Sequence, residues 1–468
     1  MISGDADPRT PLPKILQVMG TLGVFMTLGY LTLRGLSLEE LMLPAAALGL
    51  PIYLVVLVDP ILGVAILIAC IGLSPEFSIG GIRNLRVEDF LLPGLLLGWL
   101  LRTANERVAF APTRLWTPAL VSFGAMIIST LAGGPGRSGS AAMPYLIMGK
   151  YAEYMVMYLI VINTVKTETE VRALAIFAVL VALTSAILSL GGSISSAANT
   201  VEGRVRGPMG ETSNIFGGYL ALNLMIALGL FLHSTTPGSR LAAGTGVVLL
   251  CICVLFTYSR TSYVAVGGAI LLFGIVKYRR LLIILLILAA IVPVLAPGSV
   301  TERLATVGGV ASGPTPGSWS ARLYAWEWAM NRMSPVDRIL GLGIGSVAFG
   351  DVDSEYVRIF SDMGVVGVIL FAWMLFRIGS LANKTYDSLE DFTFPKGYLG
   401  GYLMAFVTMI IHSIAATTFS AIRTEETFMV LTGLMTVIAN QREILLPGGA
   451  DRPVVLLRDA SILETERR

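Results

Sequence analysis

Charged residues are scarce in this chain of 468 residues. Lysine and arginine number 33 and aspartate and glutamate 31, so 14% of the chain is charged, against roughly a quarter in ordinary soluble domains. Hydrophobic residues make up 55%. A water-soluble fold cannot bury that much apolar side chain with so little polar surface. The composition therefore excludes soluble dehydrogenases, kinases and similar classes for the whole chain and indicates a protein of the lipid bilayer.

Cysteine and histidine are also scarce. The three cysteines, Cys70, Cys251 and Cys253, lie within apolar runs, which excludes a disulfide framework and a cysteine zinc site as main themes. The two histidines, His233 and His412, are too few for a histidine-rich metal centre. The formal net charge is only +2, so the sequence predicts no nucleic-acid partner.

Long apolar runs dominate the sequence instead. A helix that spans the hydrocarbon core needs about 20 mostly apolar residues. Up to fourteen segments are candidates, over residues 15–33, 41–58, 60–73, 90–101, 115–132, 144–164, 172–192, 214–233, 241–259, 262–276, 281–296, 362–376, 398–420 and 427–440. Barrel strands would be about ten residues long and alternate in polarity, so the run lengths favour helices. The predicted fold is all-α, a polytopic transmembrane helix bundle of about 12–14 spans.

The distribution of lysine and arginine predicts the orientation. With the N-terminus in the cytoplasm, most basic residues of the short loops and the tail fall on the cytoplasmic side, and both termini are cytoplasmic. The first apolar run has no cleavage site of small residues after it, so we interpret it as a retained span. The chain then divides into an N-terminal transmembrane bundle, a large outer loop containing short helices, C-terminal transmembrane helices and a cytoplasmic tail, at 1–296, 297–361, 362–440 and 441–468.

Arginines gather on the predicted outer side. Arg204 and Arg206 lie in GRVRGPMG, just before a span that starts near Asn214, Arg260 lies in TYSRTSY, and Arg322 lies in the long outer loop. The guanidinium group matches phosphate oxygens and stays protonated. The cluster therefore predicts a site for the diphosphate of a lipid-linked substrate. The alternative is that these arginines reach lipid phosphates without a specific role.

A short helix is expected in the middle of the outer loop. On it Trp319, Arg322 and Trp326 are three and seven residues apart and share a face, and Leu323 and Met330 extend the apolar stripe. The pattern is typical of a helix lying on the membrane surface with its tryptophans at head-group level. Such a helix would aim Arg322 at the interface, and a purely anchoring helix is the alternative.

Acidic residues follow a glycine-rich turn at the end of the outer loop. The turn at 341–345 lacks the spaced glycine fingerprint of a nucleotide loop, and we interpret it as a flexible turn. Asp353 can act as the N-cap of the next helix or as a general base. Its neighbours Asp351 and Glu355 could shift its pKa or replace it, and a metal-dependent variant that uses all three stays open.

Two polar features lie within predicted spans. His412 is adjacent to Ser413 and close in sequence to Thr418, which favours a hydrogen-bonded structural histidine over an ionisable functional one. Lys150 and Glu153 are three residues apart on one span and are expected to form a structural ion pair.

In this order the motifs resemble the O-antigen ligase and polymerase family of bacterial envelope glycosyltransferases. An arginine–glycine segment leads to an asparagine at a span start in RVRGPMGETSN, and a serine–arginine pair follows a span in TYSRTSY. A helix with arginine and tryptophan comes next in ARLYAWEWAM. A glycine-rich turn, a helix and a Gly-x-x-Gly start of the next span follow in LGLGIGS and SEYVRIFSDMGVVG. The resemblance covers most of the chain and is strongest over about 200–375.

The resemblance implies a multi-pass enzyme of the bacterial inner membrane, surrounded by membrane lipids, with its large loop in the periplasm. Its donor would be a polyprenyl-diphosphate-linked oligosaccharide, transferred to an acceptor glycan with inversion. The implied catalytic residues are Asp353, Arg260 and Arg322, and the implied residues of the diphosphate and substrate site are Arg204, Arg206, Asn214, Glu355 and Tyr356. No metal and no cofactor are implied, because the arginines neutralise the leaving diphosphate.

One departure from the family pattern affects the expected activity. The family often has His-Asn-x-Tyr-Leu where this chain has Asp353-Ser354-Glu355-Tyr356-Val357. In the ligases the histidine is the proposed base, so aspartate at this place favours a polymerase of O-antigen, capsule or exopolysaccharide repeat units. The alternatives are an O-antigen ligase that transfers glycan to lipid A core or to a protein, and a polytopic transporter or flippase.

Overall fold

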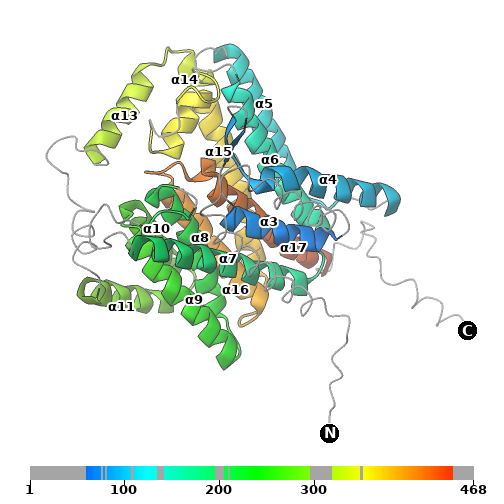
Figure 1. The fold of residues 1–468 in the computed structure, drawn as a ribbon, viewed down its shortest axis with the longest axis vertical. Helices are drawn as coiled ribbons and strands as arrows, with labels where there is room; N and C mark the ends of the chain where they lie inside the picture. The colour runs from blue at the N-terminus through cyan, green and yellow to red at the C-terminus, as the bar shows by residue number, and fades with distance from the viewer. Residues whose placement is uncertain are drawn as a thin grey trace, which may run out of the picture.

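The structure, a computed structural model, describes residues 59–74, 77–79, 82–106, 110–133, 142–194, 205–208, 211–295, 319–347 and 352–445. Over these residues the fold is almost entirely helical, as predicted (Figure 1). One small hairpin was not foreseen, in which β1 (Phe77–Ile79) pairs antiparallel with β2 (Ile82–Leu85). The predicted spans 15–33 and 41–58 and nearly all of the predicted tail lie outside the described residues.

Seven helices of the described residues are long and apolar enough to cross a membrane. They are α5 (Trp116–Gly133), α6 (Met143–Thr164), α7 (Glu168–Ile194), α8 (Ser213–Leu232), α9 (Pro237–Phe256), α15 (Glu355–Asp387) and α16 (Phe394–His412). Two apolar helices are shorter, α3 (Pro60–Leu73) and α10 (Arg260–Val276). These helices confirm a polytopic helical bundle. The total of about 12–14 spans stays a prediction because two of the candidates lie outside the described residues.

The remaining helices complete the bundle and the outer loop. They are α4 (Val87–Glu106), α11 (Arg280–Leu295), α13 (Trp319–Asn331), α14 (Asp337–Leu340), α17 (Ile422–Leu445) and the short 3-10 helix η3 (Thr418–Ser420). The short helices α13 and α14 lie at one end of the molecule beside α15 and α5 (Figure 1). They are the short helices that the sequence predicts for the long loop.

The centre of the bundle is the crossing of α8 with α16, which brings two backbones into direct contact. A Cβ atom at Gly229 of α8 would lie 2.3 Å from the backbone nitrogen of Gly401 and 2.4 Å from the carbonyl oxygen of Gly397, both on α16. Small residues at helix crossings let backbones approach closely, which is a main source of packing energy in the bilayer. The many glycines of the sequence thus have a specific use here.

The glycine-rich turn at 341–345 is packed rather than flexible, which corrects the interpretation from the sequence. Its backbone binds α15, because Leu342 N–H donates to Ser361 O at 2.8 Å and Gly343 N–H donates to Asp362 O at 3.1 Å. α15 itself is kinked nearby, at Gly364, where φ is +64°. Positive φ is a conformation that glycine adopts without steric cost, so the kink and the turn fit each other only with glycine.

One predicted span is too long. The run 398–420 predicts a single helix, but α16 ends at His412 and the chain turns through η3 before α17 begins at Ile422. Serine and threonine dominate this turn, and their hydroxyl groups compete with helical backbone hydrogen bonds. The carbonyl groups freed at residues 413–416 bind another helix, as the next subsection describes.

Candidate functional site

Four helix ends meet at one end of the bundle, namely the starts of α8, α10 and α15 and the end of α16. Asn214, on the first turn of α8, donates from Nδ2 to the carbonyl oxygen of Ala415 at 3.3 Å. Its Oδ1 accepts a 2.7 Å hydrogen bond from the hydroxyl of Ser259, which caps α10. Glu355 N–H, at the start of α15, donates to Ser413 O at 3.0 Å. Residues that are far apart in the sequence thus form one site.

His412 lies at the centre of this junction and is 1% exposed. Its Nδ1 is 2.8 Å from the hydroxyl of Thr418, and its Nε2 is 3.2 Å from the hydroxyl of Ser262 on α10. The structure confirms the predicted hydrogen-bonded histidine. It corrects the expected position, because His412 is the last residue of α16 rather than a mid-span residue.

Arg322 and Asp353 form an ion pair across the outer loop. Arg322 Nε on α13 is 3.8 Å from Asp353 Oδ2. That distance is too long for a hydrogen bond. The Arg322 side chain is 16% exposed and that of Asp353 is 48% exposed. Two of the three candidates expected to be catalytic are therefore together, loosely paired and partly exposed.

Asp353 does not cap α15, which rules out one of its two predicted roles. The residue before the helix is Ser354, and it makes no side-chain capping bond. The first helical N–H, of Glu355, is satisfied instead by carbonyl oxygens of the 413–416 turn. The N-cap interpretation is wrong because the backbone of another segment takes that place. The Asp353 carboxylate therefore stays available beside Arg322.

Glu355 is buried in a polar cluster that the sequence analysis missed. Its Oε1 accepts from Arg358 Nη2 at 3.1 Å and from the hydroxyl of Ser420 at 2.5 Å. Arg358 is 3% exposed and also donates to the hydroxyl of Tyr151 on α6 at 2.6 Å. The cluster joins α15 to α6 and η3. The three-residue spacing of Glu355 and Arg358 was the available sequence signal.

Tyr356 does not present its hydroxyl to the junction. That hydroxyl donates to the backbone carbonyl of Ile410 on α16 at 2.8 Å. The ring packs against Phe371 at right angles, with 6.2 Å between centroids. Tyr356 therefore joins α15 to α16, and its expected contact with substrate stays a prediction.

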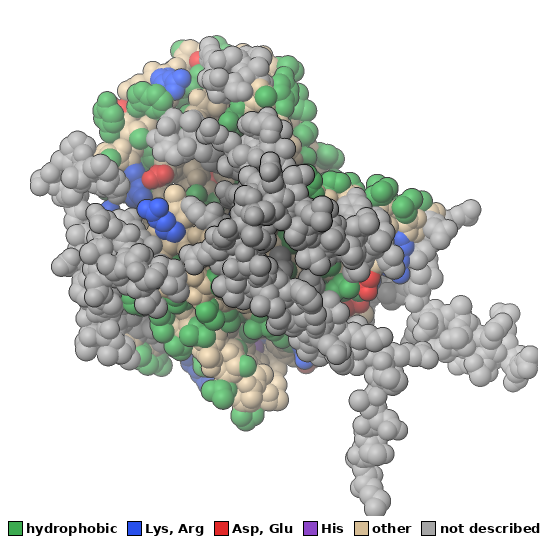
Figure 2. Space-filling view, viewed as in Figure 1, with side chains coloured by type: hydrophobic (Ala, Val, Ile, Leu, Met, Phe, Trp, Pro, Cys, Tyr) green, Lys and Arg blue, Asp and Glu red, His purple; other side chains and the backbone are tan. Residues whose placement is uncertain are grey.

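Two of the other predicted arginines, Arg206 and Arg260, lie close to the ends of α9 and α10. Arg206 is exposed between two buried neighbours, Val205 and Gly207, and the backbone of Val205 binds Phe256 O at the end of α9. Arg260 is the first residue of α10 and is half-buried, while Arg204 lies outside the described residues. Figure 2 shows basic and acidic side chains gathered on the face between α13 and α10. Such a surface suits an anionic ligand.

Beside the junction, a second set of charges is buried. Arg86 Nη2 is 2.9 Å from Glu211 Oε1, and Arg423 Nη2 is 2.6 Å from the same oxygen. Arg86 Nη1 is also 3.1 Å from Glu88 Oε1. Glu211 lies three residues before Asn214, so these ion pairs hold the segment that leads into α8 against α4 and α17. Buried ion pairs specify this arrangement because losing one partner leaves an uncompensated charge.

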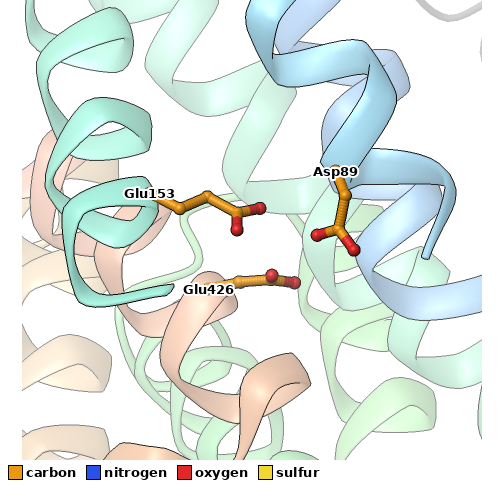
Figure 3. A group of neighbouring side chains, drawn as sticks. All are labelled: Asp89, Glu153 and Glu426. Atoms are coloured by element: carbon orange, nitrogen blue, oxygen red, sulfur yellow. The ribbon is translucent and has the colours of Figure 1, made fainter. Parts of the chain in front are cut away.

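Three carboxylates in this region could in principle hold a metal ion. Oxygens of Asp89, Glu153 and Glu426 lie within 4.8 Å of one another, and Figure 3 shows them converging. The ammonium group of Lys150 contacts Asp89 and lies 2.9 Å from Glu153 Oε2 and 3.8 Å from Glu426 Oε1. Lys150 thus supplies a counter-charge, and its predicted pair with Glu153 is confirmed.

Of the three acidic residues that the sequence left open as metal ligands, the structure describes Asp353 and Glu355, and these two have different surroundings. Asp353 is beside Arg322, whereas Glu355 is buried against Arg358. Asp351 lies outside the described residues. Among the described residues, the two carboxylates have separate cationic partners.

A cavity of about 380 Å³ lies among α5, α6, α15 and α17. Most of its lining is apolar, and it includes Phe123, Met155 and Leu370. The polar part of the lining includes Tyr151, Glu355, Arg358, Asp362 and Glu425. The cavity therefore extends from the apolar interior of the bundle to the polar cluster at the start of α15.

The comparison with protein families identifies part of the chain. Residues 245–372 match the family described as O-antigen ligase, and this range contains Arg260, Arg322 and Asp353. A search of curated proteins finds no match. The O-antigen ligases are membrane glycosyltransferase-like enzymes. Residues 245–372 are thus similar to the O-antigen ligase family, and the apolar helices around them make the chain a multi-pass membrane protein.

Proposed function

We propose that the protein polymerises repeat units of O-antigen, capsule or exopolysaccharide on the periplasmic face of the bacterial inner membrane. The donor would be a polyprenyl-diphosphate-linked oligosaccharide and the acceptor a second glycan. The observation that carries this proposal is the Arg322–Asp353 pair, 3.8 Å apart and partly exposed within the matched domain. A guanidinium suits a leaving diphosphate, and a free carboxylate suits an attacking hydroxyl.

The chemical step would be an inverting substitution at the anomeric carbon of the donor. The acceptor hydroxyl oxygen forms the new bond to that carbon, and the bond from the carbon to the diphosphate oxygen breaks. Asp353 takes the proton of the hydroxyl late in the transition state, because a sugar hydroxyl is a weak acid. Arg322, with Arg260 and Arg206, stabilises the charge that develops on the diphosphate.

The remaining residues of the site hold these groups in place. Asn214 and His412 connect α8, α10 and the end of α16 through hydrogen bonds. Glu355 connects α15 to the 413–416 turn through its backbone and to Arg358 through its side chain. We assign them positioning roles, since each makes hydrogen bonds to residues on other elements.

A ligase is the second candidate, and the description of the matched family favours it. The two reactions share the donor and differ in the acceptor. Aspartate at position 353, where the ligases have their proposed basic histidine, favours a polymerase. Analysis of lipid-linked glycan in a deletion strain separates the two. Loss of polymerase leaves single lipid-linked repeats, whereas loss of ligase leaves polymerised glycan on polyprenyl diphosphate.

The proposal is tested with purified protein in detergent and a lipid-linked repeat unit as substrate. Asp353→Asn keeps the size of the side chain and removes its basicity, so we expect kcat to fall by about 10²- to 10⁴-fold. Arg322→Ala removes a stabilising charge, and we expect a loss of about 10²- to 10³-fold. Product length is measured on gels after the lipid is released.

Matched controls separate chemistry from folding. Arg332→Ala removes an exposed arginine at the end of the same outer helix, where Arg332 stacks on Trp328 4.6 Å from its ring. Asp391→Asn removes a carboxylate that is 71% exposed and paired with Lys396. Both should keep wild-type activity. Full chain elongation by Asp353→Asn would show that the carboxylate is not the base. Detergent activity without a membrane barrier would exclude a transporter.

A further inference from the structure

The face of α13 that carries Arg322 also carries two tryptophans. Trp319 and Trp326 lie three residues before and four residues after Arg322, so all three project from the same side of the helix. The two indole rings meet at right angles, with 5.4 Å between centroids and an interplanar angle of 79°. They form a rigid aromatic corner directly beside the Arg322–Asp353 pair.

The two rings differ in exposure in a way that suits a binding surface. Trp326 is half-buried and packs against a small core of Val347 and Val352, and Val352 directly precedes Asp353. Trp319 stands on Trp326 and is 41% exposed. Trp326 therefore fixes the corner to the base of the site, and Trp319 offers aromatic surface to a ligand at little cost in conformational entropy.

Hydrogen-bond donors on this face lack acceptors among the described residues. Trp326 Nε1 and Arg322 Nε are both shielded from solvent, and neither has a hydrogen-bond partner there. Buried N–H groups of native proteins are nearly always paired, and an unpaired one calls for an explanation such as a ligand. Two such donors next to a half-exposed carboxylate indicate a ligand rich in hydroxyl oxygens.

Trp328 lies on the opposite side of the same helix. It follows Trp319 by nine residues, which places it about half a turn away around the helix, and it is 42% exposed. The guanidinium of Arg332 lies over its ring at 4.6 Å. The aromatic corner is thus confined to the side of α13 that faces Asp353.

We propose that Trp319 and Trp326 form a sugar-stacking subsite, which holds one pyranose ring of the glycan beside Asp353. The proposal rests on the proposed function and adds a binding surface to it. A pyranose ring has an apolar face of C–H bonds and an edge of hydroxyl groups. The face stacks on Trp319, and the edge accepts hydrogen bonds from Trp326 Nε1 and Arg322 Nε. A lipid tail would satisfy neither donor.

The test measures binding separately from turnover. The probe is the repeat-unit oligosaccharide of the source strain, freed from its lipid by mild acid and titrated by NMR into the full chain in detergent. We expect Trp319→Ala to weaken binding about 5- to 10-fold and to raise KM with little change in kcat. Trp328→Ala, equally exposed, should match wild type. Trp326→Phe keeps most of the ring and should weaken binding through loss of the N–H donor.

Each outcome decides between the site and its alternatives. If Trp319→Ala and Trp328→Ala bind the oligosaccharide alike, there is no stacking subsite, even when the wild type polymerises normally. If the wild type binds the oligosaccharide through Trp319 but transfers no sugar, the subsite stands and the proposed function fails. Vesicles of dibrominated phosphatidylcholine test the membrane alternative. If the vesicles quench the fluorescence of the wild type and this quenching disappears in Trp319→Ala, the face of α13 that carries Trp319 lies in lipid. That result overturns the proposal.

Discussion

At the scale of single residues, Lys150 lies outside the proposed reaction centre and interacts with three carboxylates at once. Its ammonium group pairs with Asp89 and Glu153, and it lies 3.8 Å from Glu426, which is fully buried. Neither carboxylate oxygen of Glu426 has a hydrogen-bond partner. The ion pairs therefore offset the negative charge of Glu426, and the stabilisation that they contribute requires Lys150.

Lys150→Met should destabilise the protein by about 3–5 kcal/mol, because it leaves converging carboxylates without that counter-charge. The measurement is thermal unfolding in detergent, followed by intrinsic fluorescence. Lys277→Met is the matched control, since Lys277 pairs with an Asp387 side chain that is 52% exposed. An exposed pair contributes about 0–1 kcal/mol, so this control should unfold near the wild-type temperature.

Glu426→Gln tests the same charge balance from the opposite side. It removes one carboxylate charge without changing the size of the side chain, so stability should stay unchanged or rise. Combined with Lys150→Met, it should restore part of the lost stability. A double variant as unstable as Lys150→Met alone would show that Lys150 stabilises the fold through packing of its methylene groups.

At the scale of elements, the site depends on where helices end. α16 ends at His412, and the turn that follows supplies carbonyl oxygens to Glu355 N–H and Asn214 Nδ2. The crossing of α8 and α16 at Gly229 and Gly401 sets the depth at which these ends meet. We expect a change in helix separation at the crossing to alter the hydrogen bonds of the junction, because α8 and the turn after α16 are also joined there.

Gly229→Ala should separate α8 from α16, because the new methyl group would lie 2.3 Å from the backbone of Gly401. We expect overpacking to cost about 1–3 kcal/mol and activity to fall as the junction is displaced. Gly267→Ala is the matched control, since a Cβ atom there meets nothing within 4 Å. That variant should be as stable as wild type or slightly more stable, because alanine favours helix. Equal unfolding temperatures for both would contradict the tight crossing.

At the scale of the whole molecule, hydropathy predicted the helices well and their connections less well. The run 60–73 coincides with α3, because this helix is buried on nearly all sides and apolar all round. The run 398–420 overestimated α16, because the turn after His412 is mostly buried and carries no charged residue. Length and composition cannot separate a helix from a buried turn whose carbonyl groups bind another helix.

The candidate site was predicted in part. The Arg322–Asp353 pair followed from local motifs, since each residue stood out in its own segment. The links of His412 to Ser262 and of Glu355 to Ser420 were not predicted. They join segments 65 residues or more apart, and such contacts depend on helix packing that one sequence does not encode locally.

The last helix, α17, has a consequence for how the protein is made. It begins with Arg423, Glu425 and Glu426, all buried, and it is not among the seven helices that qualify as spans by composition. Charged residues within a membrane helix are costly to insert unless they are paired. The partners that compensate Arg423 and Glu426, namely Glu211, Arg86 and Lys150, all precede α17 in the chain. The partners are therefore synthesised before α17, so we expect α17 to pack against helices that are already present in the membrane.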